Sequence, residues 1–172
     1  MDLGAGTGDW SIRLAREFPL SSFDGIDPDS TAIAKGTMQI EELGLSNVKM
    51  RVQDAESMEY SGDFDIAHLG EVLYLIRPRD EVLRACYRAL REGGLLVICE
   101  GLASGKKDMR RIENQLVHAM QLDFALQGGR FYTKSELARL LSKTGFGSVH
   151  FHDVGGGLWF VIARKLRDHH KG

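Results

Sequence analysis

A glycine-rich turn directly after a short apolar segment most constrains how this chain can fold. The first nine residues read Met-Asp-Leu-Gly-Ala-Gly-Thr-Gly-Asp, and a helical pattern follows over residues 10–18. Glycine lets the backbone turn tightly and approach a ligand closely, because it carries no Cβ atom. A dinucleotide-binding turn would place its third glycine one residue later, where Asp9 stands. The spacing therefore disfavours a nicotinamide cofactor.

Strand and helix patterns alternate over the first hundred residues. Apolar runs predict strands at 22–26, 48–52, 64–69 and 95–99, and helical patterns lie between them at 31–43 and 80–90. Strands that alternate with helices predict a parallel sheet with right-handed crossovers, which is an α/β fold.

A long helix is expected next, over residues 107–126. Four apolar residues recur there at every fourth position and predict one buried stripe: Ile112, Leu116, Met120 and Phe124. A capping-box pattern from Thr133 to Glu136 then opens another helix, which closes near Gly145.

The end of the chain predicts an antiparallel hairpin. Strands are expected at 148–154 and 158–164, and three consecutive glycines at 155–157 predict the turn between them.

Length and composition indicate one domain that spans residues 1–172, because 43% of the residues are hydrophobic and 27% are charged. The net charge of −2 creates no overall field that favours nucleic acid or an anionic membrane.

Cys86 and Cys99 lie in apolar runs, so free thiols are expected rather than a disulfide. We read no signal peptide, membrane span or metal-ligand cluster in the sequence, and we expect a cytoplasmic protein.

The glycine turn resembles the first motif of class I S-adenosylmethionine-dependent methyltransferases, which reads Asp/Glu-x-Gly-x-Gly-x-Gly. The resemblance covers residues 1 to about 100. It implies a Rossmann-like doubly wound sheet, mostly parallel, with strand order 3-2-1-4-5-7-6 and an antiparallel strand 7. The first strand of that fold is central, yet here it can contain only residues 1–3. We therefore expect a truncated first strand, with either upstream sequence or a partner completing this part of the fold.

The same resemblance implies S-adenosylmethionine as the cofactor and places its binding residues at successive strand ends, where ligands of open α/β sheets lie. These residues are Asp2, Gly4, Ala5, Gly6, Gly8, Asp27, Pro28, Asp54, Ala55, Leu69 and Gly70.

Each of these groups has an expected role. Asp2 either orders the turn or meets the amino end of the methionine. Asp27 accepts both ribose hydroxyls in a charge-strengthened pair of hydrogen bonds, with Pro28 beside the adenine. Asp54 meets the adenine amino group, and the exit at Leu69 and Gly70 passes the sulfonium. Asp27 also fits a turn aspartate before proline, and Asp54 a solvated loop residue.

Residues 127–137, together with residues 71–74, resemble small-molecule O-methyltransferases of the hydroxyindole and phenolic type. This second resemblance implies a small-molecule acceptor that is methylated at oxygen. Those enzymes carry a general-base histidine where this chain has Tyr74. The remaining base candidates are His118, Tyr74 and Glu71, with His68 behind them; His118 also fits a solvated surface position.

The residues at the end of the expected fourth strand bear on the class of methyl acceptor. Nucleic-acid acceptors are disfavoured, because residues 68–71 read His-Leu-Gly-Glu and not the Asn/Asp-Pro-Pro-Tyr motif of base amino methyltransferases. A homodimer stays open. Two other functions also remain: a non-catalytic S-adenosylmethionine-binding or assembly protein, and a nicotinamide-dependent oxidoreductase.

Overall fold

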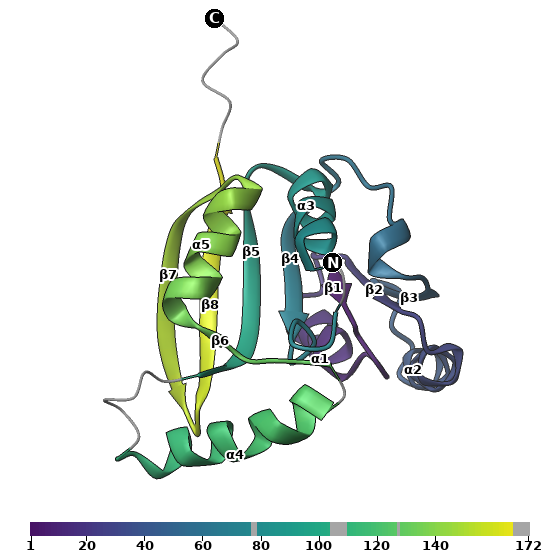
Figure 1. Cartoon of the computed structure of the whole chain (residues 1–172). Helices are drawn as coiled ribbons and strands as arrows, with labels where there is room; N and C mark the ends of the chain where they lie inside the picture. Colours follow the sequence, from purple (N-terminus) through teal and green to yellow (C-terminus); the bar gives the residue numbers. More distant parts are fainter. Residues whose placement is uncertain (77–78, 104–109, 127, 167–172) are drawn as a thin grey trace, which may run out of the picture.

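The computed structural model of the chain describes residues 1–76, 79–103, 110–126 and 128–166 (Figure 1). One sheet runs through the molecule in the order β3-β2-β1-β4-β5-β8-β7. In that order the strands are β3 (Val48–Val52), β2 (Phe23–Asp27), β1 (Asp2–Leu3), β4 (Phe64–Gly70), β5 (Leu90–Ala103), β8 (Leu158–Lys165) and β7 (Phe146–Gly155).

The strand directions confirm the predicted fold class. The strands from β3 to β5 pair in parallel, whereas β8 is antiparallel to both of its neighbours. The strand order matches the expected one, with β7 as the sixth strand and β8 as the seventh. The sequence did not predict β6 (Tyr132–Thr133), which pairs in parallel with the end of β5. The first strand is short, as expected.

Helices cover the sheet in two groups. Helices α1 (Asp9–Glu17) and α2 (Ser30–Glu42) pack against β2 and β3 through a small core around Ile12 and Ile40. Helices α3 (Arg79–Ala89) and α5 (Lys134–Thr144) pack against each other over a larger core. Figure 1 shows α3 and α5 in front of the sheet and α1 behind it.

Side-chain caps begin two of the helices. The Asp29 side chain accepts hydrogen bonds from the backbone N–H groups of Thr31 and Ala32 and so begins α2. Thr133 and Glu136 form the complete capping box of α5. Hydrogen bonds from Thr133 lower the pKa of the Glu136 carboxyl group. Gly145 ends this helix with a φ of 105°, a conformation that favours glycine.

The predicted burial of the apolar stripe on α4 (Ile112–Leu126) is wrong. Ile112, Leu116 and Met120 are 70%, 58% and 48% exposed, whereas Val117 is buried. The reason is the position of the helix: α4 lies beyond the carboxyl end of β5 and not across a face of the sheet (Figure 1). The predicted first turn at 107–109 and the side chain of Phe124 lie outside the described residues.

The two cysteines are free thiols, as predicted, with Cys86 buried and Cys99 half-buried. Burial raises the pKa of the Cys86 thiol to about 12. In the described part of the chain, no helix combines the length and the apolar character that a membrane crossing requires.

Candidate functional site

The glycine turn has the geometry that its sequence predicts. Gly4, Gly6 and Gly8 have φ values of 67°, 55° and 78°, in the left-handed region that glycine adopts without strain. The N–H groups of Gly4 and Ala5 both donate to the carbonyl oxygen of Ile26, at 2.9 and 3.0 Å. A Cβ atom at Gly6 would meet nothing within 4 Å. The turn is therefore held against β2 and leaves open space over Gly6.

Asp27 lies at the end of β2, directly beside this turn. One carboxylate oxygen accepts from Gly6 N at 2.8 Å, and the other accepts from Asp29 N at 2.8 Å. Each carboxylate oxygen can accept a second hydrogen bond, so both can still meet ligand hydroxyl groups. Pro28 follows on the exposed side. The structure thus brings together two of the predicted strand ends.

The end of β3 reaches the same edge of the sheet. Gln53 N donates to the Asp27 carbonyl oxygen at 3.1 Å. Asp54 then begins a short 3-10 helix, η1 (Ala55–Ser57), with its side chain exposed and making no capping hydrogen bond to that helix. Its carboxylate is accessible to a ligand at this edge, and Ala55 is half-buried next to it.

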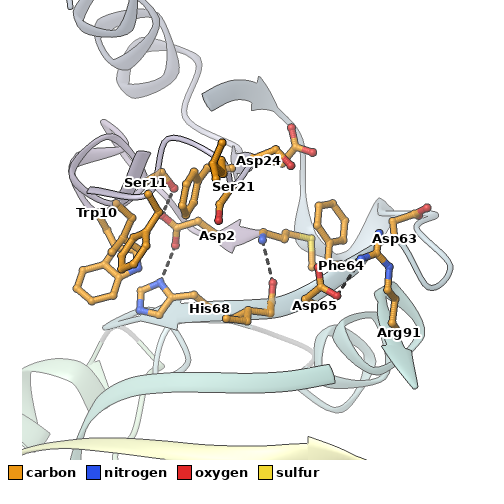
Figure 2. Close-up of a pocket in the computed structure, with 17 residues that line it drawn as sticks. Asp2, Trp10, Ser11, Ser21, Asp24, Asp63, Phe64, Asp65, His68 and Arg91 are labelled. Carbon is orange, nitrogen blue, oxygen red and sulfur yellow. Dashed lines mark hydrogen bonds and ion pairs between the residues drawn. The ribbon is translucent and has the colours of Figure 1, made fainter. Parts of the chain in front are cut away.

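Asp2 has a different environment from the other predicted cofactor residues. It is buried, and its carboxylate accepts a hydrogen bond from Ser11 Oγ at 2.9 Å and lies 2.8 Å from His68 Nδ1. Trp10 stacks on the His68 ring with the ring centroids 4.8 Å apart (Figure 2). Of the two roles expected for Asp2, this geometry favours ordering the turn, because the side chain is buried between its partners from α1 and β4.

The loop after β4 passes close to the glycine turn. Leu69 is fully buried and Gly70 half-buried at the end of β4. Glu71 follows with a φ of 50° and donates its N–H to the Cys99 carbonyl oxygen at 2.8 Å. A Cβ atom on Gly4 would lie 2.5 Å from Val72 Cγ2. The loop of residues 71–76, which we call the β4 loop, is therefore in contact with the turn.

Glu100 is a buried acid that sequence reasoning missed. It is 1% exposed, and its Oε2 accepts from Leu73 N in the β4 loop at 3.0 Å. Its Oε1 has no hydrogen-bond partner among the described residues. Burial raises the pKa of this carboxyl group to about 8, against the effect of the backbone hydrogen bonds that it accepts. The available signal was a lone glutamate directly after the apolar run at 95–99.

The three base candidates occupy two parts of the molecule. Tyr74 is half-buried in the β4 loop, with its ring centroid 5.6 Å from that of Phe131. Burial, followed by the nearby Glu100 and Glu71 carboxyl groups, raises the pKa of the Tyr74 hydroxyl. Glu71 is exposed on the same loop, whereas His118 is half-buried on α4. Tyr74 and Glu71 are thus brought together, and His118 comes from a separate element.

A cavity of about 600 Å³ lies away from this edge, between α1 and β4 (Figure 2). It reaches the amino ends of β2 and β4 at Phe23 and Phe64, and Asp65 pairs with Arg91 at its border at 2.8 Å. Asp2 lines it, but the glycine turn and Asp27 do not. The cavity is therefore distinct from the predicted cofactor edge.

Comparison with known proteins matches the sequence to one family. A family model described as a methyltransferase domain matches residues 1–145. The chain is 30% identical over 99 residues to trans-aconitate 2-methyltransferase of Deinococcus radiodurans, covering 57% of this chain and 36% of that protein. It is 25% identical over 177 residues to demethylmenaquinone methyltransferase of Listeria monocytogenes, covering 91% and 73%. The chain thus spans about a third of the first relative's length and about three quarters of the second's.

Solved structures share the fold. Human N-acetylserotonin methyltransferase in complex with SAM has a TM-score of 0.79 at 22% identity, covering 96% of this chain and 47% of that one. The [4+2]-cyclase SpnF has a TM-score of 0.78 at 21% identity, covering 96% and 74%.

Proposed function

This chain belongs to the methyltransferase domain family, and on that premise we propose that it transfers a methyl group from S-adenosylmethionine to the oxygen of a small-molecule acceptor. One observation carries the proposal: the Asp27 carboxylate and the glycine turn meet at 2.8 Å beside open space over Gly6. An acid that accepts from hydroxyl groups, next to backbone that a ligand can approach, suits the ribose and amino-acid parts of an adenosyl group.

The residues of this edge would divide the binding task. Asp27 would bind the ribose hydroxyls, Asp54 and the Ala55 N–H would meet the adenine, and the turn over Gly6 would face the amino-acid end. When bound, the cofactor supplies a methyl group on a sulfonium, which is already a good leaving group. The protein's work is then mainly alignment and exclusion of water, and orientation alone contributes several kcal/mol to such displacements.

A weakly acidic hydroxyl acceptor also needs a group that takes its proton. Tyr74 and Glu71 are the candidates on the β4 loop, and His118 is the candidate on α4. The acceptor proton would pass to Glu71 or His118 as the oxygen bonds to the methyl carbon. Tyr74, whose raised pKa keeps its hydroxyl protonated, would orient the acceptor by a hydrogen bond instead.

The names of the relatives support a small acceptor. Trans-aconitate and demethylmenaquinone are both small molecules, and a matching solved structure is named for N-acetylserotonin. We extend that class of acceptor to this chain as part of the proposal.

Two measurements test it in sequence. Isothermal titration calorimetry with S-adenosylhomocysteine tests cofactor binding, and a panel of phenols, carboxylic acids and amines with methyl-labelled cofactor tests transfer. We expect saturable 1:1 binding and label transfer to at least one hydroxyl or carboxyl compound. Label transfer to amines alone would contradict the attack at oxygen, and absence of binding would contradict the whole assignment.

A non-catalytic or otherwise diverted role is the second candidate, because the [4+2]-cyclase SpnF shares this fold and Tyr74 stands where the O-methyltransferases that the chain resembles carry a base histidine. Binding of S-adenosylhomocysteine without label transfer to any compound of the panel would favour this candidate over the first.

A further inference from the structure

Glu100 stands out among the side chains that the proposed chemistry does not use. It is the buried acid at the carboxyl end of β5, and its Oε1 lacks a partner within the described residues. Burying an acid is costly unless its hydrogen bonds are satisfied or it keeps its proton. The contacts of the Glu100 side chain therefore indicate what this buried acid does in the structure.

Those contacts lead to the cofactor turn in two steps. Glu100 Oε2 accepts from Leu73 N at 3.0 Å, which holds the middle of the β4 loop. The preceding residue, Val72, lies against Gly4, where a Cβ atom would come within 2.5 Å of its Cγ2. Movement of Leu73 therefore moves the side chain that packs on the turn.

Arg79, at the start of α3, also holds the β4 loop through two hydrogen bonds. Arg79 Nε donates to the Leu73 carbonyl oxygen at 3.1 Å, and its Nη2 donates to the Tyr74 carbonyl oxygen at 2.8 Å. Glu71, at the start of the loop, has a φ of 50°, which is a strained conformation for a residue with a side chain. A loop with a strained first residue keeps its conformation only if hydrogen bonds hold it. Glu100 supplies one of these bonds from a buried side chain.

We propose that Glu100 is a positioning residue for the cofactor: its buried carboxyl group seats the β4 loop against the glycine turn, so that a change in this group changes the affinity for the adenosyl cofactor. The inference rests on the cofactor site of the proposed function.

The protonation state of Glu100 makes the proposal measurable, because it changes with pH. The pKa of Glu100 is raised to about 8, so the group loses its proton within the range of ordinary assays. The titratable and charged groups around it are Glu71 and Tyr74 of the loop, Cys99 on β5, and Arg79 behind the loop. Loss of the proton strengthens the hydrogen bond from Leu73 N, but it also places a second negative charge next to Glu71 in a buried site. We expect the cost of that buried charge to exceed the gain, so that the loop opens and admits water.

The test is the affinity for S-adenosylhomocysteine, measured by calorimetry at pH 6.5 and pH 9 for the whole chain and for Glu100→Gln. Glutamine keeps the size and the acceptor oxygen for Leu73 N but cannot ionise. We expect the Kd of the unmodified chain to rise at least about fivefold between the two pH values, and that of Glu100→Gln to change less than about twofold. The paired comparison cancels the titration of the ligand, because the same ligand is used with each protein.

Two further variants complete the experiment. Glu92→Gln, at an exposed position of β5, should keep the full pH dependence. Val72→Ala removes the contact with Gly4 and should weaken binding at pH 6.5 while reducing the dependence on pH. It also tests the route if Glu100→Gln does not fold.

The outcomes separate the two proposals. An equal pH dependence in Glu100→Gln and the unmodified chain, a flat profile in the unmodified chain, or a Val72→Ala variant with unchanged behaviour would overturn the positioning role alone. Failure of S-adenosylhomocysteine to bind at either pH would overturn the proposed function together with it.

Discussion

At the scale of single residues, the candidate site depends on two carboxyl groups with opposite surroundings. Asp27 is partly open and accepts backbone hydrogen bonds through both oxygens, which suits an ionised group that also meets a ligand. Glu100 is closed off, with one oxygen lacking a partner among the described residues. In our proposals, Asp27 binds the cofactor and Glu100 holds the loop beside it.

Replacement of Asp27 by alanine should weaken S-adenosylhomocysteine binding by about 1.5–3 kcal/mol, the range for hydrogen bonds to charged groups. The loss combines the ribose contact with the release of Gly6 from its carboxylate partner. Calorimetry measures it, with Asp24→Ala as the matched control, since Asp24 lies on the same strand and pairs with Arg51 at 2.8 Å. Equal affinity for Asp27→Ala and the unmodified chain would remove Asp27 from the site.

Glu100 should also make stability depend on pH. Its pKa is about 8 in the folded protein and about 4.5 in the unfolded chain, so the folded state retains a proton that the unfolded state has lost between these values. The contribution to stability is therefore complete below pH 4.5 and is lost as pH rises towards 8. We expect the difference in free energy of unfolding between Glu100→Gln and the unmodified chain to grow from pH 5.5 to 8 and then level off. Urea titrations followed by circular dichroism measure it, and a difference that is constant with pH would contradict the assignment.

At the scale of elements, the turn and the helix cap could be predicted from the sequence. Which face of a helix is buried by neighbouring elements could not. The glycine turn and the capping box at Thr133 depend on neighbouring residues, and the structure confirms them. The stripe on α4 had the correct spacing for a helix, but spacing does not say which face a neighbouring element covers. Glu100 was missed for a related reason, because its contact with Leu73 joins segments that are remote in sequence.

The orientation of α4 gives a paired prediction at adjacent positions. Val117→Ala should lower the free energy of unfolding by about 1–3 kcal/mol, because this residue is buried. Leu116→Ala should change it by no more than about 0.5 kcal/mol, since the leucine is 58% exposed. Thermal or urea unfolding of both variants decides the point. A larger loss at Leu116 would show that another surface covers the outward face of α4 in solution.

At the scale of the whole molecule, β1 divides the sheet into two unequal halves. β2 and β3 with α1 and α2 form the smaller half, and β4, β5, β8 and β7 with α3 and α5 form the larger one, whose core reaches Ile26 of β2. Within the sheet, the connection between the halves is β1, which pairs with both of its neighbours through two residues, Asp2 and Leu3. The candidate cofactor edge crosses this connection, because Asp27 and Asp54 belong to the smaller half and the β4 loop to the larger.

Hydrogen exchange should report this arrangement. We expect backbone amides of β3 and α2 to exchange faster than those of β4 and β5, because regions with fewer buried contacts open at lower free energy. Saturation with S-adenosylhomocysteine should slow exchange in β2 and β3 more than in β8, since the ligand would tie the smaller half to the larger. Mass spectrometry resolves these segments, and equal protection of both halves by the ligand would contradict the bridging position.

Trp10, which stacks on His68, can serve as an intrinsic fluorescence probe. The indole ring stands in the first turn of α1, immediately after the glycine turn, and its ring partner is held by Asp2. The second tryptophan, Trp159, lies on β8 with the Lys134 ammonium 3.2 Å from its ring centre. Replacing Trp159 with phenylalanine would leave one emitter, which follows the glycine turn in sequence and lines the cavity between α1 and β4. Its emission would then report changes in the packing of α1 on β4 without any added dye.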